Sequence, residues 1–171
     1  GKKKGPIKNQ SVRGMFLAEP KDSTLPEIQF LDSQFNSLDS NNMFPIAYSY
    51  NQGVAHWPIL LNRNGEIKVF PTDWQANRTA IAKDRQGNVL MFTTEGGFFN
   101  LYNFGKFLKE SGLDIETAMP MDGGYEAEMC VKVPGFNYKT YGQFETYGPE
   151  EDVSIARARC ALPAVIGVFP K

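Results

Sequence analysis

The chain has 171 residues, of which 42% are hydrophobic and 22% are charged. This length and composition predict one folded domain that is large enough to bury a hydrophobic core. The formal net charge is −1, so the chain lacks the basic field that attracts nucleic acid, and we expect no nucleic-acid partner. No apolar run approaches the ~20 residues of a transmembrane helix, so we do not expect an integral membrane protein.

The first part of the chain predicts a tail followed by short strands. Residues 1–10 are polar and basic, and we expect them to be a disordered or non-native tail that precedes a single domain over 11–171. Residues 15–18 and 27–31 are short apolar runs and are predicted as strands. Residues 32–42 are rich in Asp, Asn and Ser, which indicates a structured loop or a short helix.

Strand patterns become clearer after this loop. Residues 46–50 and 57–61 are predicted as strands, and a turn at 62–65 leads into a return strand over 66–70. His56, the only histidine, lies just before the second of these strands. A single histidine is either a structural hydrogen-bonding residue or a residue of a cleft, and both interpretations stay open.

The clearest hairpin joins residues 77–84 to 88–94, with Gly87 in the left-handed position of the turn. Arg78 lies at the start of this hairpin, where its guanidinium could bind a phosphate or carboxylate through two parallel hydrogen bonds. The alternative is a surface arginine paired with a neighbouring acid. Glu95 follows the hairpin beside two glycines and is a second candidate site residue.

One helix is expected, over about residues 100–112. Asn100 is a good N-cap, and Gly112 stands where a left-handed C-cap belongs. The predicted core face of this helix consists of Leu101, Phe104, Phe107 and Leu108.

An Asp-Gly-Gly sequence follows the next apolar run. Asp122 before Gly123 and Gly124 suggests a strand that delivers a carboxylate to its own end, followed by a sharp turn that a ligand can approach closely. Residues 127–133 then alternate like a strand, which would place Glu126 and Glu128 together on its polar face. Acids lining a cleft could serve acid–base or metal chemistry, whereas the alternative is a turn with two solvated glutamates.

The last segment predicts a long loop and closing strands. Residues 134–152 indicate an excursion that covers a cleft, and residues 155–160 and 164–169 are predicted as strands. Cys130 and Cys160 form either one disulfide or two buried free thiols. The order of elements predicts an α+β fold with a mostly antiparallel sheet and one main helix packed on it.

Several of these motifs, in this order, resemble the phosphodiester glycosidase family, and the resemblance covers roughly the last two-thirds of the chain. The matching segments are Trp57-Pro58-Ile59-Leu60-Leu61 with Gly65, Arg78-Thr79-Ala80-Ile81-Ala82 with Asp84, Gly87 and Val89, the helix ending Phe107-Leu108-Lys109-Glu110-Ser111-Gly112-Leu113, Met121-Asp122-Gly123-Gly124, and Ala164-Val165-Ile166-Gly167-Val168. The Asn-Gly-Gly-Phe-Phe motif with which this family usually opens is absent, and the similar Glu95-Gly96-Gly97-Phe98-Phe99 follows the Arg-Thr hairpin instead.

The resemblance implies a hydrolase that releases a sugar from a sugar-1-phosphate diester, in a secreted, periplasmic or cell-envelope protein whose partner is a carbohydrate or glycan phosphodiester. Arg78 is then expected to clamp the phosphate, Asp122 to act as the catalytic carboxylate, and Glu126 to assist. A phosphate monoester is already a good leaving group, so a strong general acid is less necessary than in other glycosidases. The expected substrate-binding residues are Thr79, Gly123, Gly124, Glu95 and His56.

Two questions stay open at this level. No cofactor is certain, although a divalent cation held by Asp122 and a glutamate could share the binding of the phosphate. The alternatives to a hydrolase are a non-catalytic carbohydrate or cell-envelope binding module on the same scaffold, and a structural domain in which Asp-Gly-Gly is only a turn.

Overall fold

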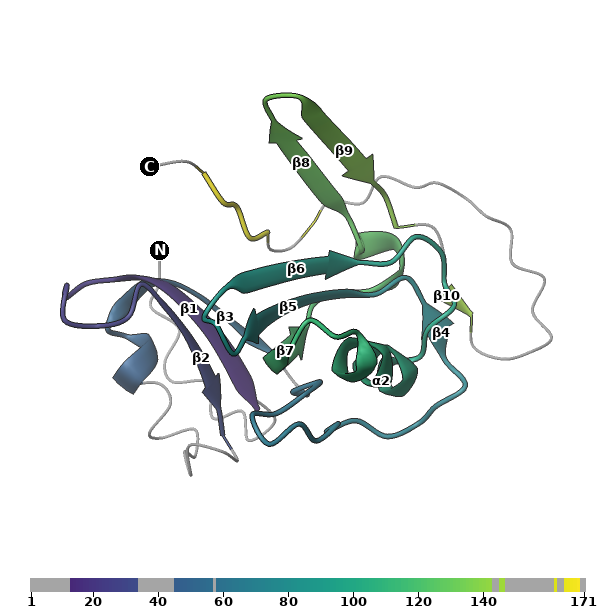
Figure 1. Cartoon of the computed structure of the whole chain (residues 1–171), viewed down its shortest axis with the longest axis horizontal. Helices are drawn as coiled ribbons and strands as arrows, with labels where there is room; N and C mark the ends of the chain where they lie inside the picture. The colour runs from purple at the N-terminus through teal and green to yellow at the C-terminus, as the bar shows by residue number, and fades with distance from the viewer. Residues whose placement is uncertain are drawn as a thin grey trace, which may run out of the picture.

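The computed structural model describes residues 13–33, 45–56, 58–142, 145–146, 162 and 165–169. Within these residues every pair of neighbouring strands is antiparallel, and one long helix accompanies them, so the predicted α+β fold class is confirmed. The described strands form two three-stranded sheets and two two-stranded ribbons, which are labelled in Figure 1. The predicted tail, residues 1–10, lies outside the described part of the chain.

The first sheet consists of β1 (Gly14–Pro20), β2 (Ile28–Asp32) and β3 (Tyr50–His56). The strands predicted over 15–18 and 27–31 are therefore confirmed. β1 lies in the centre and is buried on both faces: Met15 and Leu17 belong to one hydrophobic cluster, and Phe16 belongs to another. A run of apolar residues rather than an alternating pattern is what such a strand requires.

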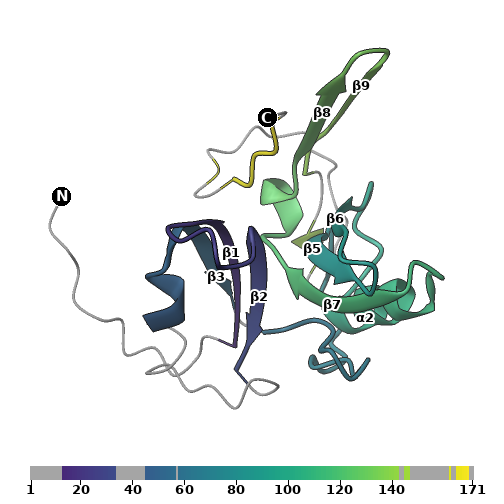
Figure 2. The ribbon, with the colours of Figure 1, turned by 60° about the vertical axis from the view of Figure 1, so that its left-hand side comes forward.

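The second sheet consists of β6 (Val89–Thr93), β5 (Thr79–Asp84) and β7 (Ile115–Pro120), and it confirms the predicted hairpin, with Gly87 at φ 93°. The two faces of β5 have different partners. Ala80 and Ala82 pack with Phe104 and Leu108 of α2 (Leu101–Glu110), which covers one face of the sheet (Figure 2). Ile81 on the opposite face packs against the first sheet in a cluster with Phe16, Phe30, Ile59 and Met119.

The helix begins and ends as predicted, but its apolar face is narrower. The side chain of Asn100 accepts a hydrogen bond of 2.7 Å from the backbone N–H of Asn103, and Gly112 takes a left-handed φ of 74° after the C-cap. Phe104 and Leu108 are each 1% exposed, whereas Phe107 is 52% exposed. The expectation that Phe107 belongs to the core face is wrong, because its ring lies at the edge of the helix contact, 5.7 Å from the ring of Phe99.

The strands predicted over 46–50, 57–61 and 66–70 are wrong in detail. Residues 45–47 are helical, and the strand begins only at Tyr50, because β1 pairs with the segment from Tyr50 to His56. Within the other two segments, Leu61 and Ile67 form a single isolated bridge.

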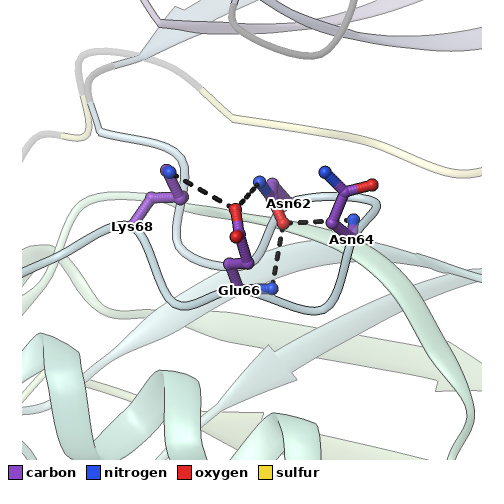
Figure 3. Close-up of polar contacts among 4 residues, drawn as sticks. All are labelled: Asn62, Asn64, Glu66 and Lys68. Atoms are coloured by element: carbon purple, nitrogen blue, oxygen red, sulfur yellow. Dashed lines mark hydrogen bonds and ion pairs between the residues drawn. The ribbon is translucent and has the colours of Figure 1, made fainter.

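The turn between these two segments is present and is organised by the side chain of Asn62. Its oxygen accepts hydrogen bonds from the backbone N–H groups of Asn64 (3.1 Å) and Glu66 (2.9 Å), and its amide nitrogen donates to the Glu66 carboxylate (Figure 3). Asn62 is buried. Its side chain takes the place of strand-ladder partners for the N–H groups of Asn64 and Glu66.

The segment expected to be a long loop, residues 134–152, contains a strand that completes a hairpin with the strand before it. β8 (Met129–Val133) pairs with β9 (Phe136–Thr140) through a turn in which Gly135 has φ 79°, and this hairpin projects from the rest of the fold (Figures 1 and 2). The prediction missed β9 because the composition of 134–152 suggested a loop, while the alternating pattern that begins at Phe136 is only five residues long.

Beyond this hairpin, β10 (Glu145–Thr146) pairs with β4 (Gln75–Ala76). The strand predicted over 155–160 lies outside the described residues, and residues 165–169 are not a strand, so that prediction is wrong where it can be followed. Cys130 is free and exposed rather than buried, and Cys160, its possible disulfide partner, lies outside the described residues. In the part of the chain that the structure describes, no helix has the length and apolar character to cross a membrane.

The N-cap of α2 provides a test of this part of the fold. We expect Asn100→Ala to lower the free energy of unfolding by about 1 kcal/mol, because the N–H of Asn103 loses its acceptor. Asn103→Ala is the matched control: its side chain is exposed and alanine favours helices, so we expect no loss. Urea unfolding followed by circular dichroism measures both, and equal effects of the two substitutions would contradict the capping role.

Candidate functional site

The loop that follows β7 is fastened to the beginning of β5 by three hydrogen bonds. The N–H of Met121 donates to the carbonyl of Thr79 (2.9 Å), and the hydroxyl of Thr79 donates to the carbonyl of Asp122 (2.5 Å). The N–H of Gly124 donates to the carbonyl of Asn77 (2.9 Å). As predicted, the strand ends just before Asp122, and the backbone on both sides of its carboxylate is fixed in place.

Different constraints require glycine at the two positions of the Asp-Gly-Gly sequence. Gly124 takes a left-handed φ of 64° and begins the 3₁₀ helix η1 (Gly124–Glu126). Gly123 has an extended backbone, with φ −115°, so the expected positive φ is found only at Gly124. A Cβ on Gly123 would lie 2.8 Å from the carbonyl oxygen of Asn77 and 3.3 Å from Nη1 of Arg78, so close approach within the protein requires the glycine.

A cavity of about 410 Å³ opens beside this loop. Its polar lining is contributed by Thr79, Asp122, Glu126, Glu128 and Lys139. The rest of its lining is almost entirely apolar and consists of Ala80, Ile81, Met91, Phe92, Met121, Met129, Cys130, Val131, Leu162, Val165 and Ile166. The volume is in the range of small-molecule binding sites, and a few polar groups in an apolar wall are typical of them.

Asp122 shares the cavity with two glutamates. Glu126 is exposed on η1, and Glu128 is half-buried. The oxygen Oε1 of Glu128 is buried and has no hydrogen-bond partner among the described residues, a costly state unless a ligand or solvent satisfies it. The strand expected over 127–133 begins only at Met129, so the two glutamates do not share a strand face, although both line the cavity.

Arg78 lies beneath the Asp-Gly-Gly loop and is not part of the cavity lining. Its side chain is buried, with Nε donating to the carbonyl of Phe99 and Nη2 to that of Trp74, each at 2.9 Å. Its guanidinium carbon lies 5.4 Å from the ring centre of Trp74, at a distance typical of cation–π contacts. These contacts hold the guanidinium against the backbone of Trp74 and Phe99, beside Gly123. The role of Arg78 as a phosphate clamp stays a prediction.

His56 lies close enough to Asp122 for their charges to interact. Burial lowers the pKa of His56 below its usual 6.5, while the negative charge of Asp122 and a hydrogen bond with the backbone of Pro58 oppose this shift. The net effect favours the neutral imidazole near neutral pH. His56 ends β3 on the first sheet, so only the folded structure brings it near Asp122.

Glu95 contacts the β8–β9 hairpin, and its role in substrate binding stays a prediction. It is exposed, it does not line the cavity, and it accepts a hydrogen bond of 2.5 Å from the hydroxyl of Tyr138. This hydrogen bond is the main cause that raises the pKa of Tyr138, followed by burial. Glu95 therefore fastens β9 to the loop after β6. Lys139, the neighbour of Tyr138, lines the cavity and was missed because its segment was expected to be a loop.

The described residues contain no group of three His, Cys, Asp or Glu side chains arranged to hold a metal ion. The divalent cation that the sequence suggested as one way to bind the phosphate therefore stays a prediction.

The model of the phosphodiester glycosidase family matches residues 7–168. The chain belongs to this family. The resemblance found in the sequence is confirmed, and the match extends it over almost the whole chain, into the first sheet. A comparison with curated proteins found no match. Membership of the phosphodiester glycosidases indicates a hydrolase that acts on glycan phosphodiesters, but it does not identify the residues of this chain that perform the reaction.

The close contact at Gly123 gives a second test. We expect Gly123→Ala to lower the free energy of unfolding by about 1–3 kcal/mol, because the new Cβ would meet the backbone oxygen of Asn77. In Gly53→Ala the new Cβ lies 2.9 Å from the end of the Leu17 side chain, which can move, so this control should cost less. Urea unfolding of both variants decides the question, and a smaller loss in Gly123→Ala than in the control would contradict the argument.

The lowered pKa of His56 gives a third test, of stability against pH. The unfolded chain binds a proton at His56 near the usual pKa of 6.5, and the folded chain does so only at lower pH. This contribution to stability is therefore complete above that pKa and declines as the pH falls below it. We expect His56→Gln to lose less stability than the unmodified chain between about pH 7.5 and pH 5.5, measured by urea unfolding. An identical pH dependence in both proteins would contradict the assignment.

Proposed function

We propose that the chain hydrolyses a sugar-1-phosphate diester and releases the free sugar, with Asp122 as its catalytic carboxylate. The observation that carries this proposal is the placement of Asp122. In a chain of the phosphodiester glycosidase family, hydrogen bonds to Asn77 and Thr79 hold its backbone beside a cavity that Asp122 shares with two other acids. A carboxylate whose backbone is held in place before the substrate arrives needs less reorganisation during the reaction.

The leaving group is a phosphate monoester, which departs without a strong general acid. The oxygen of water forms a bond to the anomeric carbon of the sugar, and the bond from that carbon to the phosphate oxygen breaks. The phosphate leaves with the electron pair as a monoester of its alcohol, and a proton of the water passes to a carboxylate. Asp122 is positioned to stabilise the positive charge that develops on the sugar or to receive this proton.

Neighbouring residues supply supporting roles. The buried, unpartnered oxygen of Glu128 can accept a hydrogen bond from a sugar hydroxyl, and the exposed Glu126 lies at the same cavity. Nε and Nη2 of Arg78 donate to backbone carbonyls, so we assign Arg78 a positive charge that acts on the phosphate through space rather than a bidentate clamp through these two nitrogens. Burial lowers the pKa of His56, so this residue adds little positive charge beside Asp122 near neutral pH.

The alternative is a carbohydrate-binding module without catalysis, and one observation favours it. Phe136 and Tyr138 on the projecting hairpin stack with ring centres 6.4 Å apart and an angle of 13° between their planes. Phe136 is exposed, and such rings can bind the face of a sugar. This alternative requires sugar binding that survives the loss of Asp122.

The deciding experiment measures release of free sugar from N-acetylglucosamine-1-phosphodiesters, with and without added divalent cation. We expect Asp122→Asn to lower kcat by about a hundredfold or more while the folded protein keeps its ligand binding. Asp114→Asn is the matched control. It lies next to the opposite end of the same strand, is exposed and ion-paired with Arg85, and has a φ of 51° that asparagine tolerates.

The outcomes separate the hypotheses. Turnover that persists unchanged in Asp122→Asn would contradict the catalytic role of Asp122. Sugar binding without release, equal in both variants, would support the binding module instead. Dependence of turnover on the added cation would favour the predicted metal.

A further inference from the structure

The composition of the cavity wall does not suit a sugar alone. Sugar hydroxyls need hydrogen-bond partners, and placing them against aliphatic side chains leaves them unsatisfied at a considerable cost. Three acids, one lysine and one threonine provide the charged and hydroxyl groups of the lining. The wall otherwise contains three methionines, a phenylalanine, a cysteine and a set of aliphatic side chains.

The polar and apolar parts of the wall follow one another along β5. Thr79 is bound to the loop of Asp122 and marks the acidic end. Ile81 lies two residues further along the strand and therefore on the same face, roughly 7 Å away. It is paired with Met91 of β6, and both line the cavity. The cavity thus continues from the acids toward an apolar region.

Lys139 supplies positive charge to this lining. It is the only lysine or arginine among the described residues of the wall, and it faces Cys130 across the β8–β9 ladder, next to the segment that carries the acids. Its Nζ lies 4.8 Å from the ring centre of Tyr141. A negatively charged phosphate would be repelled by the three acids of the wall, and this lysine offsets that repulsion.

We propose that the substrate is a sugar-1-phosphate diester of an apolar alcohol. This inference rests on the proposed function. The sugar lies at Asp122, Glu126 and Glu128, the phosphate lies near Lys139, and the alcohol extends along the apolar wall, where Val131 of β8 is one of the contacts. The apolar alcohol gains binding free energy in proportion to the area it buries, and a polar alcohol does not.

The test compares the hexyl and methyl diesters of N-acetylglucosamine-1-phosphate, both below any micelle concentration, with the whole chain. The reacting bond is the same in both compounds, so a difference in kcat/KM reports the alcohol. We expect kcat/KM for the hexyl diester to exceed that for the methyl diester by about tenfold or more, because several methylene groups are buried. Equal values would overturn the inference while leaving the proposed function intact.

Two variants locate the effect. Val131→Gln places a polar side chain in the apolar wall, and we expect the ratio of the two kcat/KM values to fall several-fold toward one. Val133→Gln is the matched control on the same strand, since Val133 is 53% exposed and does not line the cavity, and the ratio should stay at its original value. A ratio that is unchanged in Val131→Gln would overturn the inference. Release of sugar from neither diester would overturn the proposed function and this inference together.

Discussion

The hydrogen bonds that join residues 77–79 to the Asp-Gly-Gly loop determine where the candidate site lies. They connect the start of a central strand to the end of its neighbour, so the position of Asp122 is fixed by the register of β5 and β7. Arg78, between Asn77 and Thr79, is itself anchored because its side chain donates to the backbone carbonyls of Trp74 and Phe99. Because Gly123 has no side chain, the loop can approach this junction closely enough for the hydrogen bonds to form.

The two faces of β5 pack against different partners, and the cavity lies on the face that α2 does not cover. Small alanines on one face of β5 let α2 pack closely, while Ile81 on the other face contacts the first sheet. Ile81 also lines the cavity, whose outer wall comes from β8, Lys139 of β9 and residues near the end of the chain. The hydrogen bond from Tyr138 to Glu95 fastens this outer hairpin to the loop after β6. The site therefore lies between the second sheet and a hairpin that projects from the rest of the fold.

Charge and burial give the acids of the cavity different properties. Glu126 is exposed, Glu128 has a buried oxygen without a partner among the described residues, and Asp122 lies near a histidine that burial keeps neutral. The three acids therefore differ in how much of each side chain is open to a ligand in the cavity. The secreted, periplasmic or cell-envelope location stays a prediction, since it comes from the family resemblance alone.

The sequence by itself determined the family, the fold class, the β5–β6 hairpin, the caps of α2 and the placement of Asp122 at the end of a strand. These features depend on local turn chemistry, capping and short-range order, which are written in adjacent residues. Tertiary structure decided that strand pairing starts at Tyr50, that Arg78 is buried against backbone carbonyls, and that Glu95 binds Tyr138. It also brought His56 close to Asp122 and placed Lys139 in the cavity wall. These contacts join segments that are distant in sequence, and no local pattern encodes which of several possible partners a strand or side chain will meet.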